Sequence, residues 1–279
     1  MPTKKIKLKK TKIKAMIIDL GGVIVDCGSL FHSKAIYNSF KLKNIEIENK
    51  LINKTNGLKV EEQIKRILFN KKVYNAWQSR YKREPNEDDI KEISNEVNRY
   101  ILDAIDDDDY IMHKQAKKLN KFYNYKYKII FTTEYNQEIS NKLREKLKKF
   151  NFKFNHLLSY DIYKAPSPNP LICYQCAINQ EIFPMQCFIR VGDTEYNFLE
   201  GLYANLWTVG IVKTSSLLGL SQKNVRDKGI VTTDKIEKKI AKKLSKKGAL
   251  YTISTLDELK WVIEDANFKL SKGLTPYHL

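Results

Sequence analysis

The stretch IIDLGGVIVD, residues 17–26, decides which fold the rest of the chain is expected to adopt. An apolar run that begins near Lys14 ends on Asp19 and is followed by two glycines, a pattern typical of a buried parallel strand. A second carboxylate, Asp26, comes seven residues after the first. Asp19 is therefore either a reactive group at the mouth of a sheet or a strand-end carboxylate that caps local backbone.

Strand and helix patterns alternate through the second part of the chain. The apolar runs YKIIFTTE, FNHLLSYD, CFIRVGD, LWTVGIV and GALYTIST are each followed by a helical pattern. Residues 30–105 carry helical periodicity alone, and one helix start is marked by Asn86 before an acidic turn. We predict an α/β fold with an open parallel sheet, formed by residues 1–28 and 106–279, and an inserted all-helical cap over residues 29–105.

Composition narrows the class of protein. The 279 residues are 42% hydrophobic and contain no apolar run of membrane-spanning length and no signal peptide, so we expect a cytoplasmic globular protein without membrane contact. The net charge of +18 invites nucleic-acid binding, but the lysines are scattered. In the lysine-rich segment 235–248, Ile236, Ile240 and Leu244 recur at helical spacing. The lysines there are expected to form a solvated face, and nucleic acid is not the expected partner.

Three of the predicted strands end in side chains suited to one reaction. Asp19, Thr133 and Asp193 each stand at a carboxyl end, and in an open parallel sheet these ends form the binding site. An aspartate can accept a phosphoryl group when Mg²⁺ neutralises the charge and a hydroxyl holds a phosphate oxygen. Gly21 and Gly22 would let backbone N–H groups approach that phosphate closely.

These residues carry a family resemblance. The order D-x-x-G, strand-Thr-Thr and V-G-D-T resembles the haloacid dehalogenase superfamily of aspartate-nucleophile hydrolases, and more specifically its phosphonoacetaldehyde hydrolase (phosphonatase) branch. The similarity covers nearly all of residues 14–262. It is carried by KAMIIDLGGVIVDCGS, the Gly57-Leu58 pair, PNEDDI, TTEY, PSPNPLICY, VGDTEYN, LWTVGIVKTSSLLGLS and GALYTISTLDEL. The resemblance implies a Rossmann-like core with a helical cap.

The resemblance also implies roles for single residues. Asp19 stands at the nucleophile, which is also a Mg²⁺ ligand, together with the Asp193 carboxylate and the Gly21 carbonyl. Thr133 stands at the phosphate-binding hydroxyl, although the neighbouring Thr132 could equally point inward. The substrate-binding positions implied by the resemblance are Gly22, Gly57, Tyr135 and Ser167.

Several positions depart from the pattern of this branch. Phosphonatases have a cap lysine that forms a Schiff base with the substrate, and ungapped matching puts Val60 there, with Lys59 one place off and Gln63 in place of a histidine. Ser167 replaces a phosphate-binding cation, and Lys164 is a candidate substitute. Two further departures are Glu134, where a small glycine is usual, and Asn197, where a metal-supporting carboxylate is usual.

Two functions remain open at this level. One is a Mg²⁺-dependent hydrolase in which Asp19 attacks the phosphorus of a small phosphonate or phosphate ester; Lys59 and Lys164 would then assist, although Lys59 could equally be a solvated cap lysine. The other is a catalytically degenerate protein that keeps the fold for binding or scaffolding. Related phosphonatases pair through their caps, so the resemblance also implies a homodimer.

Overall fold

The computed structural model describes residues 11–112, 114–163, 165, 168–219, 221 and 230–278. The strands are β1 (Ala15–Asp19), β2 (Lys128–Thr133), β3 (His156–Ser159), β4 (Phe188–Gly192), β5 (Trp207–Ile211) and β6 (Tyr251–Ile253). The helices of the first half are α1 (Leu30–Leu42), α2 (Asn49–Thr55), α3 (Val60–Leu68), α4 (Lys71–Tyr81), α5 (Glu87–Ala104) and α6 (Lys114–Asn124). Those of the second half are α7 (Gln137–Lys149), α8 (Leu171–Gln180), α9 (Glu195–Tyr203), α11 (Ile230–Lys246) and α12 (Leu259–Ser271).

The strands form one parallel sheet in the order β3-β2-β1-β4-β5-β6. β1 lies in the middle and pairs with β2 on one side and β4 on the other, with Asp19 opposite Thr132 and Ile18 opposite Val191. The strand order reverses between β1 and β4, and the carboxyl edge at such a reversal is where ligands bind in open α/β sheets. The predicted α/β class is confirmed, and so is each of the six predicted strands.

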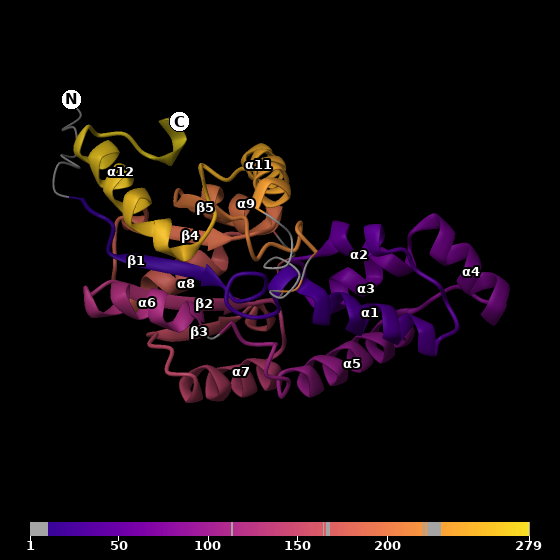
Figure 1. Cartoon of the computed structure of the whole chain (residues 1–279). Coiled ribbons are helices and arrows are strands. Elements are labelled where there is room, and N and C mark those ends of the chain that lie inside the picture. The colour runs from indigo at the N-terminus through magenta and orange to yellow at the C-terminus, as the bar shows by residue number, and fades with distance from the viewer. Residues whose placement is uncertain are drawn as a thin grey trace, which may run out of the picture.

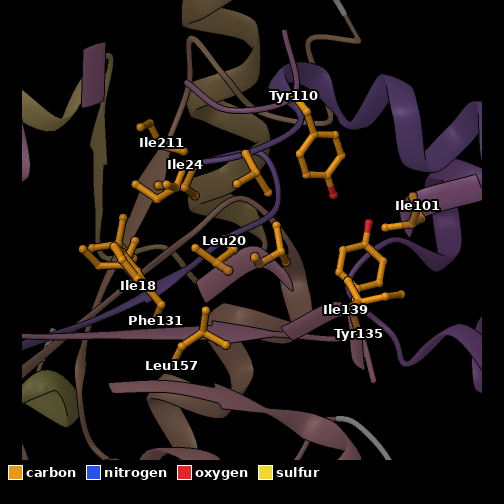
Figure 2. Packing of buried hydrophobic residues seen from close by; sticks show 14 of the residues in the cluster. Ile18, Leu20, Ile24, Ile101, Tyr110, Phe131, Tyr135, Ile139, Leu157 and Ile211 are labelled. Atoms are coloured by element: carbon orange, nitrogen blue, oxygen red, sulfur yellow. The ribbon is translucent and has the colours of Figure 1, made fainter. Parts of the chain in front are cut away.

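Different helices cover the two faces of the sheet. Because side chains alternate along each strand, successive residues pack against one layer of helices or the other. Met16 and Ile18 of β1 pack with α6, α7 and α12 in the largest hydrophobic cluster. Ala15 and Ile17 point the other way and pack against α8. Asp19, two residues after Ile17, therefore belongs to the α8 face at the end of the strand. Figure 2 shows part of the larger cluster, with Leu20, Ile24 and Phe131 around the end of β1.

The helices of residues 30–104 gather at one side of the sheet, and the C-terminal end of α5 meets α7 (Figure 1). They pack on one another through buried residues such as Ile36 of α1 and Ile93 and Val97 of α5. Asn86 caps α5 as predicted, since its side chain accepts a hydrogen bond from the Asp89 N–H and the Asp89 carboxylate accepts one from the Asn86 N–H. The boundaries of the cap, residues 29–105, stay a prediction.

The lysine-rich segment is helical, as its spacing predicts. α11 buries Ile240 and Leu244 and leaves the neighbouring Lys238, Lys239 and Lys242 exposed. In the part of the chain that the structure describes, no helix is both long enough and apolar enough to cross a membrane.

Candidate active site

The carboxyl edge of the sheet brings together groups that are far apart in the chain. Asp19 ends β1, Thr133 ends β2 and Asp193 directly follows β4. Because β1 pairs with both other strands, these residues meet at one edge. Asp19 is 4% exposed and Asp193 is 3% exposed, so both carboxylates are nearly removed from water.

The glycine pair passes close to two carboxylates. Gly22 has a φ of +66°, and a Cβ at this position would lie 2.5 Å from Oδ2 of Asp193, so a side chain there would force the Asp193 carboxylate to move. A Cβ on Gly21 would lie 3.5 Å from Oε1 of Glu134. The Gly22 N–H donates to the carbonyl of Val25 and closes the turn. The glycines therefore let the backbone lie against Asp193 on one side and Glu134 on the other.

Burial and mutual repulsion make these acids hard to ionise. Burial raises the pKa of Asp19 to about 8, and the charge of Glu134 adds to the shift, while Arg190 opposes it. Burial likewise raises the pKa of Glu134 to about 7, and it raises the pKa of Asp193. A bound cation is the simplest partner that would keep such neighbouring carboxylates ionised.

The donor set suits Mg²⁺, which prefers carboxylate and carbonyl oxygens and retains several waters. Asp19 and Asp193 interact electrostatically, and the Gly21 carbonyl lies on the backbone that passes them. Within the described residues, no three His, Cys, Asp or Glu side chains stand at metal-binding spacing. Two carboxylates with a main-chain carbonyl and water are a donor set of the kind that Mg²⁺ takes.

A buried polar network orients the Asp19 carboxylate. The Thr132 hydroxyl donates to Oδ1 of Asp19 over 3.1 Å, and Arg190 Nη1 donates to that hydroxyl oxygen over 2.8 Å. Arg190 Nη2 lies 3.8 Å from the same Asp19 oxygen and 3.3 Å from the Glu200 carboxylate. Nη2 also donates to the Tyr160 hydroxyl, which bonds Glu200 in turn. One fully buried guanidinium thus links the candidate nucleophile to α9.

The two threonines at the end of β2 have different partners. Thr132, not Thr133, contacts Asp19. The Thr133 hydroxyl accepts the N–H of Tyr135 over 3.4 Å and also interacts with the Glu134 carboxylate. A phosphate-binding role for Thr133 stays a prediction, and Thr132 is the residue that orients the carboxylate.

The cap meets the core beside Asp193. Gly57 has a φ of +89°, and a Cβ there would lie 2.6 Å from Oγ1 of Thr194, the residue after Asp193. Lys59 follows two positions later, and its ammonium donates to the main-chain carbonyl of Tyr163. None of the ion pairs and hydrogen bonds found within the described ranges joins Lys59 to Asp19. The structure thus places Lys59 as a bridge between the cap and the loop after β3.

Gln63 and Tyr135 belong to a buried hydrogen-bond network between cap and core. Nε2 of His32 pairs with Oε1 of Gln63 at 2.7 Å, and Nδ1 of His32 pairs with the Tyr135 hydroxyl at 2.9 Å. The Gln63 amide donates to Thr55, so its oxygen faces the imidazole and His32 carries its proton on Nε2. The Tyr135 hydroxyl also points toward that of Tyr110 (Figure 2). Tyr135 is thus committed to His32, and its predicted contact with substrate stays a prediction.

Asp26 has a structural role. Its two carboxylate oxygens each accept a 2.9 Å hydrogen bond, from the N–H groups of Phe31 and His32 at the start of α1. Burial raises the pKa of Asp26 to about 6, although these hydrogen bonds act to lower it. Cys173 and Cys176, on α8, are buried free thiols, and burial raises the pKa of Cys173 to about 12, as expected for core packing.

Two candidate residues, Lys164 and Ser167, lie outside the described residues. The sequence interpretation missed Arg190 and understated Thr132. A signal for Arg190 was present, because a cation inside the apolar run CFIRVGD needs a buried anion. The position of Glu134 beside Gly21 had no such signal, since it depends on how two separate loops approach each other.

The comparisons with known proteins agree with this fold. A phosphonoacetaldehyde hydrolase of Bacillus cytotoxicus is 27% identical over 253 residues, covering 91% of this chain and 96% of the relative. A crystal structure of a phosphonoacetaldehyde hydrolase-like protein from Oleispira antarctica superposes with a TM-score of 0.88 at 24% identity, covering 95% of this chain and 96% of the other. A β-phosphoglucomutase from Clostridium difficile superposes with a TM-score of 0.65 at 20% identity, covering 92% and 99%. No family model matches the chain.

The relatives match by sequence over nearly the whole chain, and the solved structures share its core and cap. The site keeps an acid at the end of β1, a hydroxyl on β2 and an acid after β4. The chain is therefore similar, over nearly its whole length, to phosphonoacetaldehyde hydrolases of the haloacid dehalogenase superfamily.

Proposed function

We propose that this protein is a Mg²⁺-dependent hydrolase in which Asp19 attacks the phosphorus of a small phosphonate or phosphate ester. The observation that carries the proposal is the meeting of two buried carboxylates, Asp19 and Asp193, where the strand order of the sheet reverses. Burial raises the pKa of each acid, and the opposing groups that the protein itself supplies do not offset this shift. A divalent cation would supply positive charge that opposes it.

The residues that would hold the ion are Asp19, Asp193 and, through its carbonyl, Gly21. Bound there, Mg²⁺ would neutralise the carboxylates and the phosphoryl oxygens, so that an anionic nucleophile can approach an anionic substrate. Ser216 keeps Asp193 in place, because its N–H donates to Oδ2 over 2.6 Å. The absence of a side chain at Gly22 leaves space for the Asp193 carboxylate.

Asp19 would act by forming and then losing a bond to phosphorus. Thr132 and Arg190 both face Oδ1, which fixes the plane of the carboxylate and favours its ionised form. Attack by the carboxylate forms an aspartyl phosphate and releases the leaving group. Water then attacks the same phosphorus, and the Asp19 carboxylate is regenerated.

The contact of Lys59 bears on the substrate class. Cleavage of a C–P bond in an aldehyde substrate needs an amine that forms an imine and accepts the electrons of that bond. The Lys59 ammonium is bound to the Tyr163 carbonyl and would have to leave it to do so. A phosphate ester needs no such electron acceptor. Both substrate classes therefore belong in the test, and the phosphate ester is the one for which Lys59 need not move.

The experiment compares the wild type with Asp19→Asn. Purified protein with Mg²⁺ is assayed for phosphate release from phosphonoacetaldehyde and from a panel of small phosphate esters. We expect turnover of at least one substrate that falls by ~10³-fold or more in Asp19→Asn, since the amide cannot serve as the nucleophile. Equal rates for wild type and variant across the panel would refute the proposal and leave a binding function for the fold.

A further inference from the structure

Hydrolysis of a phosphate ester requires a proton donor as well as a nucleophile. The departing alkoxide is strongly basic, and the water that follows must lose a proton as it attacks. Gly21, which lies next to the candidate metal site, has no side chain to do either. The proton donor has to come from another element that reaches the same space.

Glu134 reaches it from the loop after β2. Its Oε1 lies 3.5 Å and its Oε2 4.0 Å from where the Cβ of residue 21 would be. The carboxylate thus lies beside Gly21, and it interacts electrostatically with Asp19 and Asp193. Oε2 is shielded from solvent, and no described residue gives it a hydrogen bond. One oxygen of Glu134 is therefore free to exchange a proton with a bound molecule.

The other role for an acid at this place is that of a third metal ligand. The described side chains include no set of three acids at metal-binding spacing, although Asp19, Glu134 and Asp193 all interact. Glu134 is held instead by its neighbours, since the Thr133 hydroxyl and its own N–H both face the carboxylate. This geometry favours proton transfer over metal coordination.

We propose that Glu134 is the general acid and base of this site and that the substrates are phosphate monoesters with basic leaving groups, such as alkyl phosphates. This inference rests on the proposed function. In the first step the bond from Asp19 to phosphorus forms, the bond from phosphorus to the ester oxygen breaks, and Glu134 gives its proton to that oxygen. In the second step Glu134 takes a proton from water, water oxygen bonds phosphorus, and the bond to Asp19 breaks with release of phosphate.

The dependence on the leaving group tests this role. Glu134→Gln keeps the shape of the side chain but holds no transferable proton, and Glu138→Gln on the exposed start of α7 is the matched control. With propyl phosphate, whose leaving group needs a proton, we expect kcat/KM to fall by ~10²–10⁴-fold in Glu134→Gln. With 4-nitrophenyl phosphate, whose leaving group departs as an anion, we expect kcat/KM to fall by less than ~10-fold in the same variant. The control should match the wild type with both.

Two further measurements separate this role from a metal or folding defect. Calorimetric titration with Mg²⁺ and the melting temperature should both be nearly unchanged in Glu134→Gln. Equal losses with the two esters, or a weakened affinity for Mg²⁺, would overturn the assignment while leaving Asp19-dependent hydrolysis intact. If Glu134→Gln does not fold, Glu134→Asp tests the same point, because its carboxylic acid still carries a transferable proton. The loss of kcat/KM in Glu134→Asp should then differ by less than ~10-fold between the two esters. A wild type without Asp19-dependent turnover of any ester would instead refute the proposed function.

Discussion

Replacing Arg190 by methionine should destabilise the protein strongly, and more so at high pH. The guanidinium is fully buried on β4 and lies 3.3 Å from the Glu200 carboxylate, which is itself 1% exposed in its side chain. Methionine fills a similar volume but leaves Glu200 without its cation. Breaking one side of a buried ion pair costs about 3–5 kcal/mol.

The pH dependence follows from Glu200. Burial raises the pKa of Glu200 to about 7, above its ordinary value of 4.5, and Arg190 acts against that shift. Removal of Arg190 therefore raises the pKa further. A carboxyl whose pKa is higher in the folded than in the unfolded state loses stability as pH rises from the unfolded pKa through the folded pKa. We expect the full loss at pH 8 and a smaller loss at pH 5, where Glu200 is protonated in both proteins.

Urea denaturation of the wild type and Arg190→Met at pH 5 and pH 8, both without Mg²⁺, measures this effect. The control is Arg99→Met, which removes a surface pair with Glu96 and should cost less than about 1 kcal/mol at either pH. The double variant Arg190→Met, Glu200→Leu should regain part of the loss, because the unpaired buried charge is gone. A loss for Arg190→Met below about 1 kcal/mol at pH 8, or an equal loss at the two pH values, would show that Arg190 does not stabilise the buried Glu200 carboxylate.

Three more predictions follow from the same contacts. Gly22→Ala should cost roughly 1–3 kcal/mol in the free energy of unfolding and weaken Mg²⁺ binding, because the methyl group meets Asp193. The control Gly273→Ala, with a φ of +78° and no atom within 4 Å, should lower stability without changing Mg²⁺ affinity, and equal effects of the two variants on that affinity, measured by calorimetry, would contradict the prediction. Gln63→Leu should cost about 1–3 kcal/mol in the free energy of unfolding, measured by thermal denaturation, because it leaves the buried Nε2–H of His32 without an acceptor. A loss no greater than that of the control Gln78→Leu, at an exposed position, would contradict this prediction. The metal-free wild type should lose stability from pH 5 to pH 9, because the pKa values of Asp19 (about 8) and Glu134 (about 7) lie above those of the unfolded chain. Asp19→Asn should make this decline smaller, and urea denaturation of both proteins across the pH range would detect or exclude the difference.

The fold could be predicted from local patterns. The short apolar runs that end on polar residues correspond to β1, β2 and β4, since strands buried on both faces need apolar residues at every position. Asn86 before an acidic turn marked the start of α5, and the structure shows the capping bonds that explain it. These signals are carried by neighbouring residues and need no knowledge of tertiary contacts.

The details of the site depend on contacts between distant segments. A threonine pair at the end of a strand does not reveal which hydroxyl faces β1; the register of Asp19 with Thr132 decides it. The sequence shows Glu134 only as a departure from the usual small glycine, and the structure shows that its carboxylate lies in the space beside Gly21. Lys59 reads as a displaced catalytic lysine, and only the approach of the cap to the loop after β3 gives it the Tyr163 carbonyl.

We propose that Asp19 and Asp193 hold one divalent cation between them. A crystal structure of the wild-type protein grown with Mn²⁺ in place of Mg²⁺ tests it most directly, because the anomalous signal locates the ion without reference to activity. We expect one strong peak at ligand distance from a carboxylate oxygen of Asp19 and from one of Asp193, and we expect this peak to be lost in Asp193→Asn. A peak bound by neither residue, or no peak at this edge of the sheet at saturating Mn²⁺, would contradict it.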